Sequence, residues 1–178
     1  MEEKLMRRIG IIIGSTSDLP QCLNGLRYLQ KAVQEKLIEV PVFLVASIHR
    51  NTSVVLQQLT AWSKYNYIDV LIAGAGMANH LTGMCDAYLR YTLENDHIVV
   101  VGVAFSHENP ENTAAAIKSI TQVPNNQIIF DDYVGSHGFH RACFFATKGE
   151  LPQITLPQPK EYYSVSLDEA MAAIEKKK

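Results

Sequence analysis

The sequence has few cysteines, no long apolar run and no excess of charge of one sign, and each absence excludes a class of protein. Its three cysteines, Cys22, Cys85 and Cys143, are widely spaced and form no Cys-x-x-Cys pair. We therefore expect free thiols that pack in the core of a cytoplasmic protein. The apolar runs are far shorter than a membrane span, and residues 1–8 lack a signal-peptide core, so no membrane partner is expected. A net charge of −2 without a basic stripe argues against nucleic acid as a partner.

Several catalytic signatures are also missing from the sequence. There is no Walker lysine motif, no Gly-x-Ser-x-Gly elbow and no cysteine in a nucleophile's signature neighbourhood. His137 and His140 are three residues apart with acidic residues nearby, but Gly138 argues against a helix there and the pattern supplies no third ligand. We therefore expect no metal.

What the sequence does contain is a regular alternation of predicted strands and helices. Short β-branched runs predict buried strands, and apolar residues at three- and four-residue steps predict helices between them. This alternation indicates an α/β fold, a three-layer αβα sandwich built on a doubly wound parallel sheet. The expected strands are 9–13, 41–45, 69–73 and 97–103, and the best-defined helices are 19–36 and 112–123.

The chain is less regular after the predicted helix at residues 112–123. Residues 128–130 could form a strand, and 142–146 are a plausible fifth strand. Between them, residues 131–140 look like an excursion, a segment outside the regular alternation of strands and helices. We expect residues 1–150 to form one α/β domain. Residues 151–178 read as a proline-rich linker followed by a helix. A capping box formed by Ser166 and Glu169 predicts that this helix starts near Leu167 and docks on the domain or on a neighbouring subunit.

Three polar loops follow the first three predicted strands, and parallel strands bring such loops to one edge of the sheet. The first contains Ser15, Ser17 and Asp18 before a helix that has Pro20 in its first turn. Hydroxyls beside a helix N-terminus are typical of an anion site, although a capped turn without a ligand has the same pattern.

The second and third loops carry the side chains suited to chemistry. His49 can take and return a proton near neutral pH, and Arg50 presents a planar donor fork for a phosphate or carboxylate. Gly74 and Gly76 allow close approach of the backbone to a ligand. His80 could donate to a ligand, and it could equally cap a helix or pack; His49 could likewise be an ordinary loop histidine.

Taken together, three motifs resemble the 5-(carboxyamino)imidazole ribonucleotide mutases of purine biosynthesis. They are Gly14-Ser-Thr-Ser-Asp18, Ser47-Ile-His-Arg50 and Ala73-Gly-Ala-Gly-Met-Ala-Asn-His-Leu-Thr-Gly-Met84. The resemblance covers residues 8 to about 124 and implies a flavodoxin-like fold, an octameric assembly and no cofactor. It also implies that the substrate is a small ribonucleotide and that residues 1–150 form a ribonucleotide-binding catalytic domain.

The resemblance further implies a role for each loop. Ser15, Ser17 and Asp18 would hold the ribose and phosphate end of the substrate. Ser47 and Arg50 would also bind it, and His49 would shuttle the proton. The remaining pocket residues, Gly74, Ala75, Gly76, His80 and Leu81, would line the space for carbon dioxide and the base.

Two departures from the family pattern keep other functions open. Ala104 stands where members usually have proline, and the chain after Pro124 differs from the usual direct continuation into a strand. The alternatives are a carboxylase acting on aminoimidazole ribonucleotide on the same scaffold, and a diverged ribonucleotide-binding protein without turnover.

Overall fold

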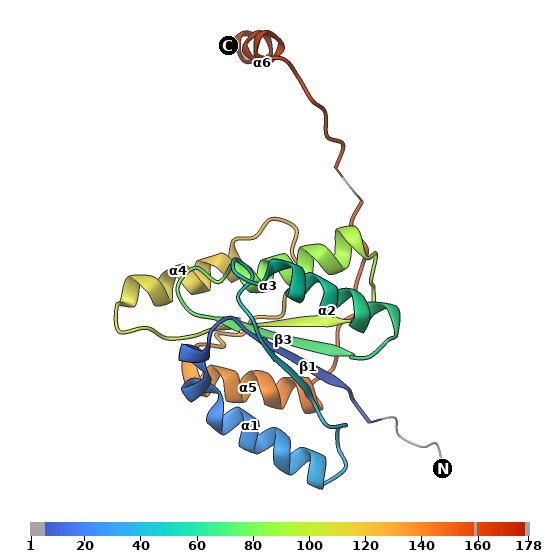
Figure 1. Cartoon of the computed structure of the whole chain (residues 1–178), viewed down its shortest axis with the longest axis vertical. Helices are drawn as coiled ribbons and strands as arrows, with labels where there is room; N and C mark the ends of the chain where they lie inside the picture. Colours follow the sequence, from blue (N-terminus) through green and yellow to red (C-terminus); the bar gives the residue numbers. More distant parts are fainter. Residues whose placement is uncertain (1–5, 159, 177–178) are drawn as a thin grey trace.

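Four short apolar strands pair in parallel at the centre of the protein (Figure 1). The structure is a computed structural model that describes residues 6–158 and 160–176. The sheet order is β2-β1-β3-β4, and all three pairings are parallel. The strands are β1 (Ile9–Ile13), β2 (Val42–Val45), β3 (Val70–Ala75) and β4 (Val99–Ala104).

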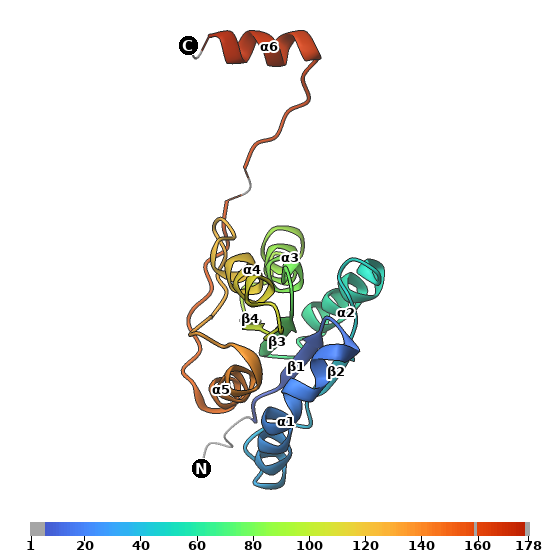
Figure 2. The same cartoon turned by 90° about the vertical axis from the view of Figure 1, so that its left-hand side faces the viewer.

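Helices cover both faces of this sheet, which confirms the predicted three-layer αβα sandwich (Figure 2). α1 (Leu19–Gln34) and α5 (Gly135–Lys148) pack together on one face. The other face carries α2 (Thr52–Lys64), α3 (His80–Ala87) and α4 (Pro110–Thr121). α3 continues into a π-helical turn, Tyr88–Thr92.

Alternating strand residues supply the two cores that hold the layers together. In β1, Ile11 and Ile13 pack toward α1 and α5, whereas Ile12 packs toward α2 and α3. β1, β3 and β4 are apolar throughout because both of their faces are covered. The predicted role of the cysteines is also confirmed, since all three thiols are free and buried. Burial raises the pKa of Cys22 and Cys85 to about 12.

The prediction for residues 131–146 is wrong, because this segment contains α5 rather than an excursion and a strand. A Cβ at Gly138 would lie 2.2 Å from the carbonyl carbon of Tyr133. Gly138 is therefore present because the helix passes close to that backbone, and this packing outweighs the low helix propensity of glycine. The neighbouring segment 128–134 runs along β4 as two isolated parallel bridges, at Ile129 and Val134.

Two other helices differ from the predictions only at their ends. α1 ends at Gln34 instead of Lys36. α4 starts at Pro110 instead of Asn112 and ends at Thr121 instead of Val123. The side chain of Asn109 accepts a hydrogen bond from the Glu111 amide and so caps the helix at the earlier start.

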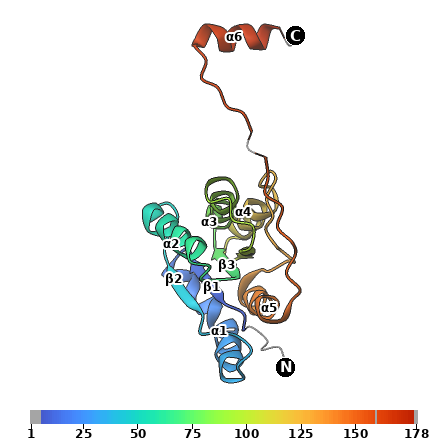
Figure 3. The ribbon, with the colours of Figure 1, turned by 90° about the vertical axis from the view of Figure 1, so that its right-hand side faces the viewer.

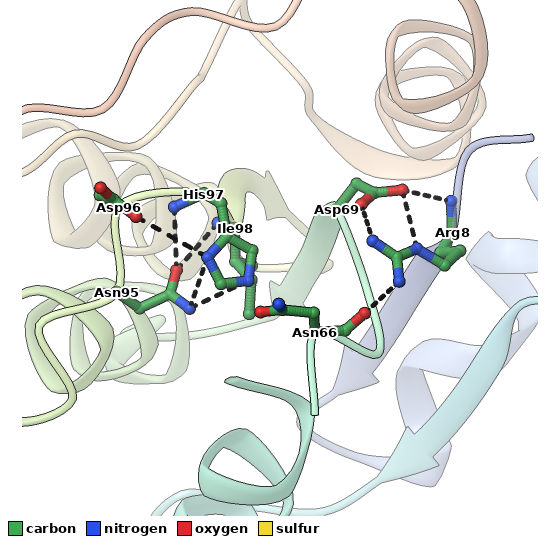
Figure 4. A network of polar contacts seen from close by, with 7 residues as sticks. All are labelled: Arg8, Asn66, Asp69, Asn95, Asp96, His97 and Ile98. Carbon is green, nitrogen blue, oxygen red and sulfur yellow. Dashed lines mark hydrogen bonds and ion pairs between the residues drawn. The ribbon is translucent and has the colours of Figure 1, made fainter. Parts of the chain in front are cut away.

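Side chains at the amino ends of the strands fix the edge of the sheet opposite the predicted loops (Figure 4). The backbone amide of Arg8, before β1, donates to Asp69 Oδ2 at 2.8 Å, and the Arg8 guanidinium pairs with the same carboxylate before β3. Asn95 Oδ1 accepts from the amides of His97 and Ile98 ahead of β4. These contacts set where three strands begin.

A buried ion pair joins α3 to the start of β4. Asp86 and Arg90 are each 2% exposed, and Arg90 Nε donates to Asp86 Oδ1 at 3.2 Å. The guanidinium also donates to the carbonyls of Asn95 and Ile98, while Asp86 Oδ2 accepts from the Gln127 amide. Burial raises the pKa of Asp86 and lowers that of Arg90. Each charge therefore depends on the other.

The C-terminal segment first lies on the domain and then leaves it (Figure 3). Ile154 is buried in the core beside α5, and Thr155 exchanges two hydrogen bonds with the Gln127 side chain. α6 (Leu167–Glu175) begins at the predicted residue, and the capping box of Ser166 and Glu169 is confirmed. None of its residues is buried, so its docking on a neighbouring subunit stays a prediction.

Asp86→Asn is expected to lower the free energy of unfolding by roughly 3–5 kcal/mol, because it leaves the buried Arg90 charge without its partner. Urea unfolding followed by circular dichroism measures this. The control is Asp131→Asn, which breaks an exposed ion pair with Arg141 and should cost less than about 1 kcal/mol. Equal losses in the two variants would contradict a structural role for the buried pair.

Candidate active site

The loops at the carboxyl ends of all four strands surround one cavity of about 540 Å³. It lies where β1 and β3 are adjacent, since the chain crosses from one face of the sheet to the other there. Ten of the eleven predicted site residues line it. They are Ser15, Ser17, Asp18, Ser47, His49, Arg50, Ala75, Gly76, His80 and Leu81. The predicted convergence of the three polar loops is therefore what the structure shows.

Gly74 is the predicted site residue that does not line the cavity. It lies within β3, and its carbonyl accepts a hydrogen bond from the Gly14 amide at 2.9 Å. A Cβ at this position would come within 2.8 Å of the Phe105 ring. Gly74 therefore serves packing beneath the site, whereas Gly76 lies at the cavity itself.

The first loop presents two hydroxyls and a carboxylate. Ser15 Oγ accepts from the Ser17 amide and lies 2.8 Å from Ser17 Oγ. Asp18 precedes α1 but makes no side-chain cap; instead its Oδ2 accepts from the Gly76 amide at 3.4 Å. Burial raises the pKa of this carboxyl, and the hydrogen bond from Gly76 offsets part of that effect. The carboxylate thus ties the first loop to the third.

Two histidines meet across the cavity from different strands. His49, after β2, and His80, at the start of α3, are joined by a hydrogen bond of 3.0 Å between Nε2 and Nδ1. Their rings stand nearly perpendicular, at 86°. One of the two nitrogens must carry the proton and the other must accept it. The hydrogen bond therefore fixes how the two rings lie relative to each other in the cavity.

Hydrogen bonds fix the backbone on which each of these two histidines lies. Ser47 Oγ accepts from the amides of His49 and Arg50, which fixes the turn after β2. Behind His80, the buried Asn79 side chain donates to the Val103 carbonyl and accepts from the Thr82 amide. These bonds hold both rings on short, rigid connections to the sheet.

The sequence interpretation missed the fourth loop of the cavity. Ser106 and His107, after β4, line it together with Gln21 from α1. Gln21 and Ser106 exchange two hydrogen bonds, each of 3.0 Å. Loops at the carboxyl ends of parallel strands meet at one edge of the sheet, and this holds for β4 as for the first three strands. The predicted strand at residues 97–103 could therefore have indicated this fourth loop.

The structure also places the two histidines that raised the question of a metal. His137 and His140 lie on α5 and face a separate groove beside Tyr28. Within residues 6–158 and 160–176, no group of three His, Cys, Asp or Glu residues is arranged to hold a metal ion. In the same part of the chain, every helix is too short or too polar to cross a membrane.

Comparisons with solved structures agree with this architecture. The crystal structure of a serine-to-aspartate variant of Treponema denticola PurE2 superposes with a TM-score of 0.59 at 12% identity, covering 97% of this chain and 94% of that one. Treponema denticola PurE gives 0.55 at 13% identity, covering 96% and 93%. At such low identity these likenesses show the fold alone, and it is the predicted flavodoxin-like one.

Sequence comparisons establish the family. N5-carboxyaminoimidazole ribonucleotide mutase of Pyrococcus abyssi (strain GE5 / Orsay) is 31% identical over 156 residues, 88% of this chain and 79% of that protein. The mutase of the same name from Thermotoga maritima is 32% identical over 119 residues, 67% and 61% of the two chains. A family model described as AIR carboxylase matches residues 8–161. This span includes all four loops around the cavity, and the chain therefore belongs to the AIR carboxylase family.

Proposed function

We propose that the protein is a 5-(carboxyamino)imidazole ribonucleotide mutase, an isomerase of purine biosynthesis. It would move a carboxylate from the exocyclic nitrogen of the substrate to a ring carbon. The observation that carries the proposal is the His49–His80 pair, which lies in one cavity with Asp18 and Arg50. The two mutases at 31% and 32% identity support the same reaction.

The four loops would divide the substrate between them. Arg50 and Ser47 would bind the phosphate, for which a guanidinium fork and a hydroxyl are suitable donors. Ser15, Ser17 and Asp18 would hold the ribose end. Gly76 and Leu81 would line the space for the base, since the missing Cβ of Gly76 leaves room for a planar ring.

His49 would move the single proton that the isomerisation requires. It donates a proton to the carbamate nitrogen, and the N–C bond breaks to release carbon dioxide. The electron-rich ring carbon then attacks carbon dioxide, and His49 removes the proton from that carbon. The proton returns to its starting place and no cofactor takes part. His80 would keep the imidazole of His49 oriented through both transfers.

The cavity would contribute by keeping carbon dioxide next to the ring carbon. Its volume of about 540 Å³ suits a small ribonucleotide. Holding the two reactants together replaces a bimolecular encounter, and such positioning can be worth roughly 7–11 kcal/mol. This effect needs only the shape of the site and one proton carrier.

The description of the family model supports a second candidate, a carboxylase that uses free carbon dioxide. Purified protein incubated with carboxyaminoimidazole ribonucleotide, without bicarbonate, separates the two by the ultraviolet change. A mutase turns over alone, whereas a carboxylase needs aminoimidazole ribonucleotide plus bicarbonate. A protein that only binds shows saturable thermal stabilisation and no product.

His49→Asn is expected to lower turnover by at least about 100-fold, the usual contribution of a general acid–base group. Asparagine keeps a polar side chain of similar reach at the base of the ring, so ligand should still raise the melting temperature. Steady-state rates and thermal shift measure the two effects. His137→Asn on the exposed face of α5 is the matched control, and equal loss of rate and ligand protection in His49→Asn would mean that His49 is structural.

Asp18→Asn is expected to stabilise the free protein at pH 7 and to weaken ligand binding. Burial raises the Asp18 pKa in the folded state, so its contribution to stability is present at low pH and lost as the pH rises through that pKa. Asparagine removes this loss, so Tm should rise at pH 7; in a chain of this size each 1 kcal/mol of added stability raises Tm by about 2–4 °C. Thermal melts should show the gain at pH 7 and its decrease below the Asp18 pKa; a gain independent of pH would contradict the charge as its cause.

We also propose that the protein works in the cytoplasm as a homo-oligomer, an octamer by resemblance to its family. α6 supports an assembly, because Leu167, Met171 and Ile174 are 76%, 52% and 63% exposed and share one side of the helix. Light scattering should give a multiple of the chain mass. Changing these three residues to serine should lower that mass, whereas Ala172→Ser with Ala173→Ser on the opposite side should not. A monomeric mass for the unaltered chain would defeat the proposal.

A further inference from the structure

His107 is a titratable side chain of the cavity for which neither the three motifs nor the proposed reaction supplies a role. It follows β4 by way of Phe105 and Ser106, and it lines the same cavity as His49 from a different strand. Its backbone amide donates to Thr113 Oγ1 at 2.9 Å. The residue is therefore attached to the first turns of α4.

The hydrogen bonds of the His107 ring define its proton. The Asn109 amide lies 3.0 Å from Nδ1, and a backbone N–H can only donate. Asn112 Nδ2 approaches the same nitrogen at 3.2 Å. Nδ1 must therefore be an acceptor without a proton, and the neutral ring carries its proton on Nε2. His107 thus has one N–H donor left over for a ligand.

The loop that carries His107 is fixed on the side of the cavity where Asp18 lies. Gln21, one helical turn after Asp18, exchanges two hydrogen bonds with Ser106, the neighbour of His107. Phe105 donates its amide to the Ala75 carbonyl at 3.1 Å. Asp18 and Phe105 also flank Gly76, with atoms 3.3 and 3.8 Å from the position of a Cβ there. Asp18 and His107 therefore belong to the same end of the cavity.

These two side chains offer complementary groups to a ligand. The Asp18 carboxylate can only accept hydrogen bonds, and its Oδ1 receives none from the part of the chain that the structure describes. His107 Nε2–H can only donate. A phosphate would be repelled by Asp18, and an amino group would offer His107 no good acceptor. Adjacent sugar hydroxyls satisfy both, because each hydroxyl donates once and accepts as well.

We propose that His107 is a substrate-binding residue that, with Asp18, recognises the 2′- and 3′-hydroxyls of the ribose and so selects ribonucleotides over 2′-deoxyribonucleotides. This inference rests on the proposed function for the class of ligand. It adds a fourth loop to the substrate site, and with it a second side chain, beside Asp18, at the ribose end. Arg50 would hold the phosphate from the loop after β2, which lies at the far side of β1 from β4.

Two substitutions test whether His107 donates a hydrogen bond to the ligand or only supports its own loop. In His107→Asn the amide oxygen can still accept from the Asn109 amide, but the Nε2 donor is gone. In His107→Gln the longer side chain can place an N–H near the position of Nε2. His137→Gln, exposed on α5 and outside the cavity, is the control. Calorimetry measures the Kd of aminoimidazole ribonucleotide and of its 2′-deoxy form for each protein.

We expect His107→Asn to weaken binding of the ribonucleotide about fivefold, as loss of one neutral hydrogen bond predicts. Its preference for ribose over deoxyribose should fall, and His107→Gln should restore part of both. In turnover, KM should rise with little change in kcat, because the contact is made equally in ground and transition states.

Other outcomes distinguish the two proposals. An unchanged Kd and ribose preference in His107→Asn, beside normal turnover, would overturn the role of His107 and leave the proposed function intact. If His107→Asn bound the ribonucleotide normally while His107→Gln bound it more weakly, the ring would only support its loop. Failure of the unaltered protein to bind either nucleotide would overturn the proposed function and this inference with it.

Discussion

The parallel pairing of β1 with β3 is the constraint on which the rest of the structure depends. Ile9 to Ile13 of β1 pair in register with Val70 to Gly74 of β3. From this pair the chain extends outward to β2 on one side and to β4 on the other. The loops that leave β1 and β3 consequently separate toward opposite faces, and the cavity lies between them. Every polar group of the site depends on this reversal of strand order.

Backbone hydrogen bonds and buried amides then convert the crevice into a defined site. Gly14 donates to Gly74, and the Asn79 side chain connects the third loop to β4. The Gln21–Ser106 pair connects α1 to the fourth loop. None of these contacts involves a group that must bind a ligand or carry a proton. These supporting contacts therefore leave His49 and Asp18 free for the roles proposed for them.

Much of this arrangement could be predicted because its signals are local. The short β-branched run Ile9–Ile13 predicts a buried strand, and Ser15, Ser17 and Asp18 follow it closely. The 3.0 Å contact of His49 with His80 could not be predicted, since it joins residues 31 apart through the packing of two strands. α5 was missed for a similar reason: the closeness of Gly138 to the Tyr133 backbone is visible only once the chain is folded. His107 was missed because nothing in its own neighbourhood distinguishes it from an ordinary loop residue.

The two most buried ion pairs of the described chain lie at the amino ends of the strands, away from the cavity. Arg8 with Asp69, and Arg90 with Asp86, hold that edge, whereas the residues that line the cavity lie at the carboxyl edge. Substitutions at one edge of the sheet therefore do not directly alter the contacts at the other edge. Evolution or protein engineering can therefore change the thermal stability of this protein by substitutions around Arg8 and Arg90 without changing its substrate specificity. New specificities can likewise be explored at the loops while the scaffold beneath them keeps its shape.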